Sequence, residues 1–336
     1  MNVPKGQHYV TKSYLRGFAN GAGKKARLYI YERGKPEPYQ QHPEKVAKQN
    51  YYYSFQDEKG QLDHSVEEFF GMIEASALPV ISRLAREDFQ PDWIERGWLA
   101  AFMAMHEMRV PWMRESLDEA TAQLIKHMTR FSVSVPGHLE RSLERMKAEG
   151  KDVEPEMAKE IQEMVEHDEY DIKITDDRHS LALALEMMPE LTERYAHMKW
   201  TVVRSTETLP FITSDNPLVR VNPRYTGGFY DGHGVDNKNI EIRFPLDKTT
   251  ALIVMQDLKR VEQFSTLLEA GNEEEAMQLR ESVPVTSFMK APPQLIEAVN
   301  VGTARYARRF VLAYAKDNQM PEMMGPASGG LRLQVG

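Results

Sequence analysis

The chain contains no cysteine among its 336 residues. This absence excludes disulfide bonds, thiolate nucleophiles and zinc sites with cysteine ligands. No apolar run approaches the length needed to cross a bilayer, and the opening MNVPKGQHYV has no apolar stretch typical of a signal peptide. We therefore expect a cytoplasmic protein with no membrane partner.

A strong excess of positive charge is also missing. The formal net charge is −8 and the isoelectric point lies near 5.8. These values argue against a broad electrostatic surface for nucleic acid, but they do not exclude a local basic cleft. Hydrophobic residues at 41% and charged residues at 27% are typical of a globular protein, whose core at this length can occupy one domain or two.

Strand patterns gather at the two ends of the chain and helical patterns in its middle. The strand-like segments are residues 27–32, 50–55, 200–204, 211–213, 218–221, 240–244 and 251–255. Helical patterns occupy residues 63–198, with a break expected at Val110-Pro111, and return in 258–281 and 293–316. This segregation predicts an α+β fold with a mixed or antiparallel sheet formed by the N- and C-terminal parts.

The domain organisation follows from the same pattern. Residues 1–316 are expected to form a single domain, in which the helical section of about residues 63–198 is an insertion. Residues 317–336 are rich in Met, Pro and Gly, so we predict a loose C-terminal tail.

The opening segment from Gln7 to Phe18 places polar side chains among apolar residues that need a core. His8 has the chemistry of a general base or a metal ligand, although a histidine with one structural hydrogen bond fits the same position. Arg16 follows eight residues later, and it can clamp a phosphate or carboxylate or pair with a glutamate.

The segment Phe211-Ile212-Thr213-Ser214-Asp215-Asn216-Pro217 runs from an apolar strand into polar residues. A strand end of this kind can present Asp215 and Asn216 for catalysis, either as ligands to a metal or to orient a nucleophile. The same residues also make an excellent turn, because Asp and Asn bond their own backbone and Pro presets the dihedral.

The helix around Phe102 places His106 and Arg109 next to each other beside an apolar stripe. Charged or polar groups at such a place are costly unless they have partners, and the glutamates of the preceding helix, Glu67, Glu68 and Glu74, can supply them. The two-histidine zinc motif is not present, because the second His is missing. Structural and functional roles both remain open for this pair.

Several of these motifs resemble those of a widespread bacterial family catalogued as domain of unknown function 4238. The resemblance spans about residues 7–315. It rests on His8-Tyr9-Val10 with Tyr14-Leu15-Arg16 and Phe18, on Asn50-Tyr51-Tyr52, Glu74 and Arg109, on Phe211 to Pro217, and on Asn300. Thr11 departs from the family pattern, which usually has Pro there. The resemblance implies that His8, Arg16, Asp215 and Asn216 belong to one site, and it implies no activity.

Two functions fit these residues. The first is a metal-assisted or acid/base hydrolase that acts on a phosphodiester or a nucleotide, with His8 as base, Asp215 as metal ligand or orienting carboxylate, and Arg16 and Arg109 as anion clamps. Its ligand would be a small molecule or a nucleic-acid fragment, and its cofactor a divalent metal, if it has one. The second is a non-enzymatic ligand-sensing or interaction module, in which the same residues form a structural hydrogen-bond network.

Overall fold

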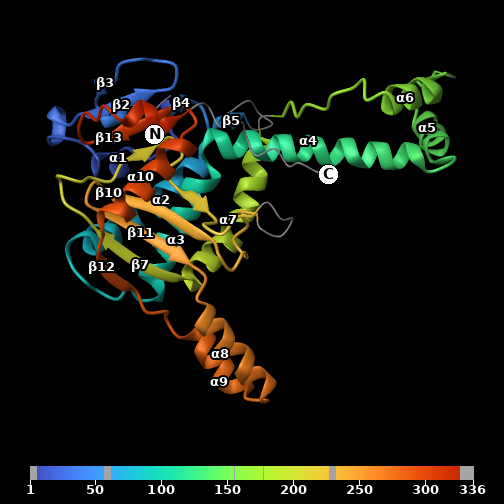
Figure 1. The fold of residues 1–336 in the computed structure, drawn as a ribbon. Coiled ribbons are helices and arrows are strands. Elements are labelled where there is room, and N and C mark those ends of the chain that lie inside the picture. The colour runs from blue at the N-terminus through green and yellow to red at the C-terminus, as the bar shows by residue number, and fades with distance from the viewer. Residues whose placement is uncertain (1–5, 57–61, 155, 177, 227–231, 326–336) are drawn as a thin grey trace. The chain divides into compact units, whose positions relative to one another are not determined.

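The computed structural model describes residues 6–56, 62–154, 156–176, 178–226 and 232–325 (Figure 1). These residues divide into two compact units. The first comprises the described residues up to Met113 and those from Ala184 onward, and the second comprises Arg114–Leu183. The expected helical section of residues 63–198 is therefore shared between the two units.

The largest sheet of the first unit has five strands in the order β12-β7-β11-β10-β9. These strands are β7 (Lys199–Arg204), β9 (Val219–Val221), β10 (Glu241–Asp247), β11 (Thr250–Met255) and β12 (Ser287–Lys290). All neighbours are antiparallel except β12 and β7, which run parallel. The side chains of β11 are almost all buried, as expected for a strand that is covered on both faces.

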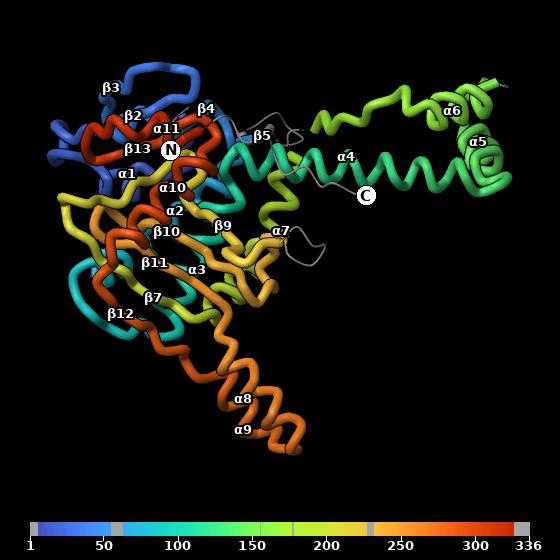
Figure 2. The backbone as a smooth tube through the Cα atoms, in the orientation of Figure 1, coloured from blue at the N-terminus to red at the C-terminus, as the bar shows by residue number. Residues whose placement is uncertain are grey.

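A second sheet joins the two ends of the chain, in the order β3-β2-β13-β8. It pairs β2 (Leu28–Glu32) and β3 (Tyr39–Gln41) with β8 (Thr213–Ser214) and β13 (Phe310–Ala313), all antiparallel. Figure 2 shows the N-terminal and C-terminal segments side by side in this sheet. The predicted α+β fold, with sheets built from both parts of the chain, is confirmed.

Two short strand pairs complete the sheets. β1 (Gly6–His8) pairs with β4 (Lys48–Asn50), and β5 (Phe55–Gln56) pairs with β6 (Leu62–Asp63). The strand predicted for residues 50–55 is largely wrong, because the chain turns after Asn50. Tyr51 has a left-handed φ of 54°, which a continuous strand cannot accommodate.

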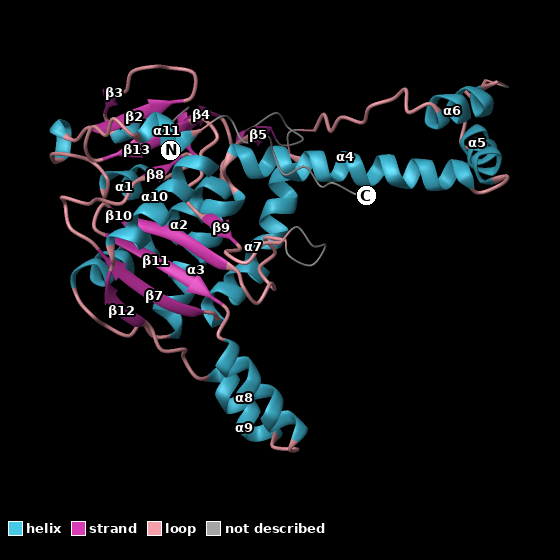
Figure 3. Ribbon diagram, viewed as in Figure 1, coloured by secondary structure: helices cyan, strands magenta, loops and turns pink. Residues whose placement is uncertain are grey.

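The helices, in chain order, are α1 (Lys12–Arg16), α2 (Ser65–Arg86), α3 (Trp93–Met108), α4 (Pro111–Ser134), α5 (His138–Ala148), α6 (Met157–Glu166), α7 (His179–His197), α8 (Leu258–Glu269), α9 (Glu273–Glu281), α10 (Pro293–Tyr306) and α11 (Met320–Met324), with 3₁₀ turns at Gly23–Lys25 and Pro43–Lys45. The predicted break at Val110-Pro111 is confirmed, since α4 begins at the proline, whose missing N–H is tolerated in a first turn. α8 and α9 pack against each other as a hairpin (Figure 3). No helix within the described residues is both long and apolar enough to cross a membrane.

α10 supports both sheets of the first unit. Its Ile296 and Val299 pack with Val203 and Phe211 at the five-stranded sheet. Its later residue Ala304 belongs to a second apolar cluster with residues of the four-stranded sheet. The helix therefore packs against both sheets, and the segment 211–216 supplies β8 of the four-stranded sheet.

The end of the chain differs from the sequence-based expectation in two respects. The helix predicted for residues 293–316 ends at Tyr306, and Phe310–Ala313 is a strand that pairs with both β2 and β8. α11 lies in the segment from residue 317, for which the sequence predicts a loose tail, and Met320 is fully buried there. Residues 326–336 of that expected tail lie outside the described residues.

The second unit contains most of α4, together with α5, α6 and the start of α7. Polar contacts hold its segments together. Lys126 Nζ lies 2.6 Å from Asp168 Oδ1, and His179 Nε2 lies 3.1 Å from the Thr121 hydroxyl. α4 has no buried residue, and α5 and α6 each bury a single apolar side chain, so this unit has little apolar core of its own.

Candidate functional site

The opening segment is held in the first unit by its own polar groups. Gln7 accepts a hydrogen bond from the Tyr53 backbone N–H at 2.6 Å and donates one to the Ser54 hydroxyl at 2.7 Å. Thr11 caps α1 by accepting the Tyr14 N–H at 3.3 Å. This cap gives the helix a defined first residue.

His8 lies at the end of β1, directly opposite Lys48 in β4. Its ring is half-buried, and the pKa of His8 is lowered from 6.5 to about 4, with burial as the largest cause. The positive charges of Lys48, Lys12 and Arg109 contribute to this decrease, and a hydrogen bond with the backbone of Val46 opposes it. At neutral pH the imidazole is therefore uncharged and can accept a proton.

Arg109 follows the last residue of α3 and is almost completely buried. Its Nε donates to the Tyr9 carbonyl at 2.9 Å, and its Nη2 lies 3.5 Å from His106 Nε2. Its guanidinium also lies 5.5 Å from the centre of the Phe70 ring. Arg109 therefore fixes the backbone next to His8 and adds a buried positive charge beneath it.

His106 has a structural role in this arrangement. Its Nδ1 lies 2.9 Å from the Phe102 carbonyl, which makes Nδ1 the protonated nitrogen. Its Nε2 then accepts the Thr11 backbone N–H at 3.5 Å. Burial holds the pKa of His106 well below its usual range, and the charge of Arg109 acts in the same direction. The ring is therefore a neutral acceptor that joins α3 to the start of α1.

Glu67 on α2 interacts electrostatically with Arg109 and Lys12. Burial raises the pKa of Glu67, while the charges of Arg109 and Lys12 oppose the rise. Glu67 and His8 thus respond to the same two cations. We call His8, Lys12, Lys48, Glu67 and Arg109 the His8 cluster.

Arg16 points toward a different partner. Its Nη2 lies 2.9 Å from Glu44 Oε1, and the side chains of both residues are about half exposed. An exposed ion pair of this kind contributes little to stability. No interaction connects Arg16 with the His8 cluster among the described residues.

Asp215 is buried behind the turn that follows β8. Its carboxylate accepts three backbone N–H groups, from Arg308 at 2.8 Å, Arg309 at 2.6 Å and Phe310 at 3.0 Å. Burial nevertheless raises the pKa of Asp215 to about 6, because the cost of removing the charge from water exceeds the stabilisation by the three N–H groups. The two carboxylate oxygens are thus occupied by the backbone that leads into β13.

Asn216 continues the same network. Its side-chain amide donates to the Tyr306 carbonyl at 3.2 Å, and its backbone N–H donates to the Ser214 hydroxyl at 3.1 Å. Asp215 and Asn216 together tie the turn after β8 to the segment between α10 and β13. Their contacts are those of a turn that also anchors a distant part of the chain.

The opening segment and this turn meet through two tyrosines. Burial raises the pKa of Tyr9, and the negative charge of Asp215 raises it further. The Tyr14 hydroxyl lies 2.9 Å from the Thr213 hydroxyl and donates to the Pro245 carbonyl at 2.7 Å. The predicted site residues are therefore divided. His8 and Arg109 share one cluster, Asp215 and Asn216 share a second, Tyr9 connects the two, and Arg16 lies apart.

A cavity of about 320 Å³ lies beside α1, between α2 and the turn from β10 to β11. Ser13, Tyr14, Arg86 and Asp247 are among the residues that line it. None of the five predicted site residues does. Its position next to the opening segment shows that this part of the fold is not completely filled.

Lys12, Lys48 and Glu67 are the members of the His8 cluster that were not among the predicted site residues. Lysines are common on every surface, so their residue type carries no signal. Lys48 faces His8 because β1 pairs with β4, and this pairing cannot be predicted from the sequence. In the described part of the chain, no three His, Cys, Asp or Glu side chains gather in a way that could hold a metal ion.

Comparison with known proteins bears on the family alone. Neither the search of curated proteins nor the search of solved structures found a match. The family model described as "Protein of unknown function (DUF4238)" matches residues 6–317. The match covers nearly the whole chain, and the chain therefore belongs to this family.

Proposed function

We propose that the His8 cluster is the acid–base site of a hydrolase that acts on a phosphodiester or a nucleotide. The observation that carries the proposal is the neutral imidazole of His8 among three cations, with the pKa of His8 lowered to about 4. A neutral base in a positively charged setting suits an anionic substrate, since the cations attract the substrate and keep the base unprotonated.

The other members of the cluster have complementary roles in this proposal. Lys12 and Lys48 are exposed and can contact phosphate oxygens directly. Arg109 is buried, adds a positive charge to the cluster, and donates a hydrogen bond to the Tyr9 carbonyl. Glu67, whose pKa is raised by burial, is the candidate general acid. A base and an acid with pKa values moved in opposite directions are a pattern found at catalytic sites.

Asp215, Asn216 and Arg16 take other parts in the proposed enzyme. The backbone occupies the carboxylate oxygens of Asp215, so its role is to position the turn that faces Tyr9. Asn216 strengthens the same turn. Arg16 forms a surface pair with Glu44 and is left out of the catalytic group.

The test uses bis(p-nitrophenyl) phosphate as the substrate and the full chain as the enzyme. His8→Gln should lower kcat/KM by about a hundredfold or more, the typical contribution of a general base. Glu67→Gln should remove the alkaline limb of the pH–rate profile. His127→Gln, an exposed histidine of the second unit, is the matched control and should leave the rate unchanged. Unchanged hydrolysis in a folded His8→Gln variant would overturn the proposal.

A second candidate function is a ligand-sensing or interaction module without catalysis. The observation that favours it is the Asp215 network, in which both carboxylate oxygens accept backbone N–H groups and so serve the fold. In that case, Asp215→Ala should lower the melting temperature strongly, while the wild-type chain shows no hydrolysis. A thermal-shift screen with nucleotides and divalent metals would then identify a ligand, because specific binding stabilises the folded state by mass action.

A further inference from the structure

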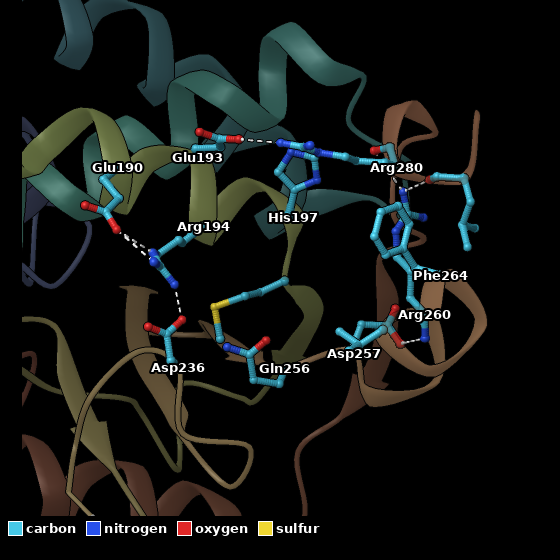
Figure 4. A pocket seen from close by; sticks show the side chains of 13 residues that line it. Glu190, Glu193, Arg194, His197, Asp236, Gln256, Asp257, Arg260, Phe264 and Arg280 are labelled. Carbon is cyan, nitrogen blue, oxygen red and sulfur yellow. Dashed lines mark hydrogen bonds and ion pairs between the residues drawn. The ribbon is translucent and has the colours of Figure 1, made fainter. Parts of the chain in front are cut away.

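A cavity of about 500 Å³ lies between the C-terminal end of α7 and the α8–α9 hairpin (Figure 4). All residues that line it belong to the first unit. Its volume is within the range of small-molecule sites, about 300–1,000 Å³. It is built from segments distinct from those of the His8 cluster, so it requires a separate explanation.

The cavity is lined by apolar side chains together with polar and charged ones. Met198, Phe264 and Leu279 supply the apolar surface. Burial lowers the pKa of His197, and the centre of its ring lies 4.9 Å from that of Trp93. An aromatic ring beside hydrogen-bonding groups is the lining expected of a site for an organic molecule.

Two of the three arginines at the cavity are used by the protein itself. Arg260 donates to the backbone carbonyls of Leu279, Arg280 and Ser282, and so holds the end of α9 against α8. Arg280 pairs with Glu193 on α7 at 3.4 Å. Arg260 therefore serves the fold of the hairpin, and Arg280 has a carboxylate partner on α7.

The third arginine, Arg194, pairs with two carboxylates. Arg194 pairs with Glu190 at 2.7 Å and also with Asp236. One guanidinium therefore serves two carboxylates, and this side of the cavity has an excess of negative charge (Figure 4). A ligand that enters here meets a potential that favours cations.

Asp257 is the N-cap of α8, and Phe264 follows about two turns later on the same face of the helix, so both line the cavity. One oxygen of its carboxylate accepts the Arg260 backbone N–H at 3.2 Å and caps the helix. Among the described residues, no N–H or O–H group donates a hydrogen bond to the second oxygen. A carboxylate and an aromatic side chain that line one cavity suit an organic amine, because the carboxylate attracts the ammonium group and the ring contacts the apolar part.

We propose that this cavity binds a small organic amine, with its ammonium group at Asp257 and its apolar part against Phe264 and Met198. The ligand would connect α7 to the α8–α9 hairpin, which has few buried residues of its own. Binding therefore also restrains the hairpin. The proposal does not depend on the hydrolase function and involves none of its residues.

The experiment compares three probes of nearly equal size: 2-phenylethylamine, 2-phenylethanol and 3-phenylpropionate. Isothermal titration of the full chain should show that the amine binds most tightly and the carboxylate most weakly. Asp257→Asn should weaken amine binding about tenfold, equivalent to about 1.4 kcal/mol, and leave the alcohol unchanged. Asparagine is an equally good helix cap, so the variant keeps the start of α8 intact.

Glu262→Gln is the matched control, because it removes one exposed carboxylate from the same helix outside the cavity lining. It should leave binding of all three probes unchanged. Phe264→Ala should weaken the amine and the alcohol alike. Hydrogen exchange in α8 and α9 should slow when the amine is present.

Three results would overturn the proposal: no heat of binding for the amine at millimolar concentration, binding of the carboxylate as tight as that of the amine, or an undiminished affinity in Asp257→Asn. Each of these leaves the hydrolase proposal standing, since Asp257→Asn should not change phosphodiester hydrolysis. Loss of hydrolysis in His8→Gln, in turn, should not change amine binding.

Discussion

The Asp215 carboxylate offers the sharpest test of the physical reasoning, through the variant Asp215→Asn. In the wild-type chain it is buried, and it accepts the backbone N–H groups of Arg308, Arg309 and Phe310. Burial and these hydrogen bonds move the pKa of Asp215 in opposite directions, and burial is the larger effect. Asparagine has nearly the same size but cannot titrate, so the variant removes the charge and keeps the shape.

The magnitude follows from the pKa of Asp215, which rises from 3.8 to about 6 in the folded protein. The folded state binds the proton more tightly than the unfolded state, so stability decreases as the pH rises between these two values. The full difference corresponds to about 3 kcal/mol, of which about 2 kcal/mol falls between pH 4.5 and pH 7.5. Wild-type Asp215 therefore stabilises the fold more in mild acid than at neutral pH.

The assay is urea unfolding of wild type and Asp215→Asn at both pH values, followed by tryptophan fluorescence and circular dichroism with coincident transitions. The variant should be less stable at both, because an amide NH₂ replaces one acceptor oxygen and faces the backbone N–H donors. The stability difference should shrink by about 2 kcal/mol from pH 4.5 to pH 7.5. Asp152→Asn, at an exposed position, is the control and should show no such change.

The opposite slope would refute the reasoning. A stability difference that grows with pH would mean that the three N–H groups outweigh burial and that the folded carboxylate prefers its charge. A difference independent of pH would mean that Asp215 titrates alike in both states. Either result would remove the argument that desolvation dominates at this position.

Three further predictions concern other parts of the first unit. An NMR titration should find the pKa of His8 near 4. Because the folded state binds this proton more weakly than the unfolded state, the fold should lose stability as the pH falls from about 6.5 toward 4. A pKa near 6.5 would contradict the account of the His8 cluster. Tyr195→Phe should lower the free energy of unfolding by about 1–3 kcal/mol, because the buried pair of Glu107 and Arg220, at 2.7 Å, loses a hydrogen-bonding partner. Urea unfolding measures this change. An unchanged free energy would show that water replaces the hydroxyl. Met320→Ala should cost about 2–5 kcal/mol in the same assay, and a near-neutral effect would show that α11 is not part of the core.

The parts of the fold that could be predicted are those in which local chemistry decides. Pro111 cannot continue a helix, and the chain breaks there. The sequence does not predict the strand Phe310–Ala313, because these residues continue the apolar spacing of the preceding helix. Its strand conformation comes from pairing with β2 and β8, which are distant in sequence. Tyr51 was misread because aromatic residues favour strands in general, while its left-handed φ is a local requirement of this turn.

The candidate site was predictable in its residue types and not in its grouping. The sequence indicates that His8, Arg109 and Asp215 need partners, since such groups are costly when buried alone. Which partners they find depends on the register of β1 against β4 and on the approach of β13 to the turn after β8. The sequence groups His8 with Asp215 in one site, whereas the proposed reaction uses His8 as the base and gives Asp215 a positioning role only. Meanwhile, the hydrogen bonds of Asp215 are all to backbone.

The two clusters nevertheless depend on each other through Tyr9. The Tyr9 carbonyl accepts a hydrogen bond from Arg109 Nε, and the negative charge of Asp215 raises the pKa of the Tyr9 phenol. We therefore expect a change at Asp215 that loosens the turn to affect Tyr9, the residue next to His8, even though Asp215 contacts no substrate in the proposed reaction. Loss of activity at Asp215 would thus be ambiguous by itself, since a positioning role and a catalytic role predict the same sign. His8→Gln is the more informative substitution, because His8 lies on a short edge strand whose backbone pairing with Lys48 the change leaves in place.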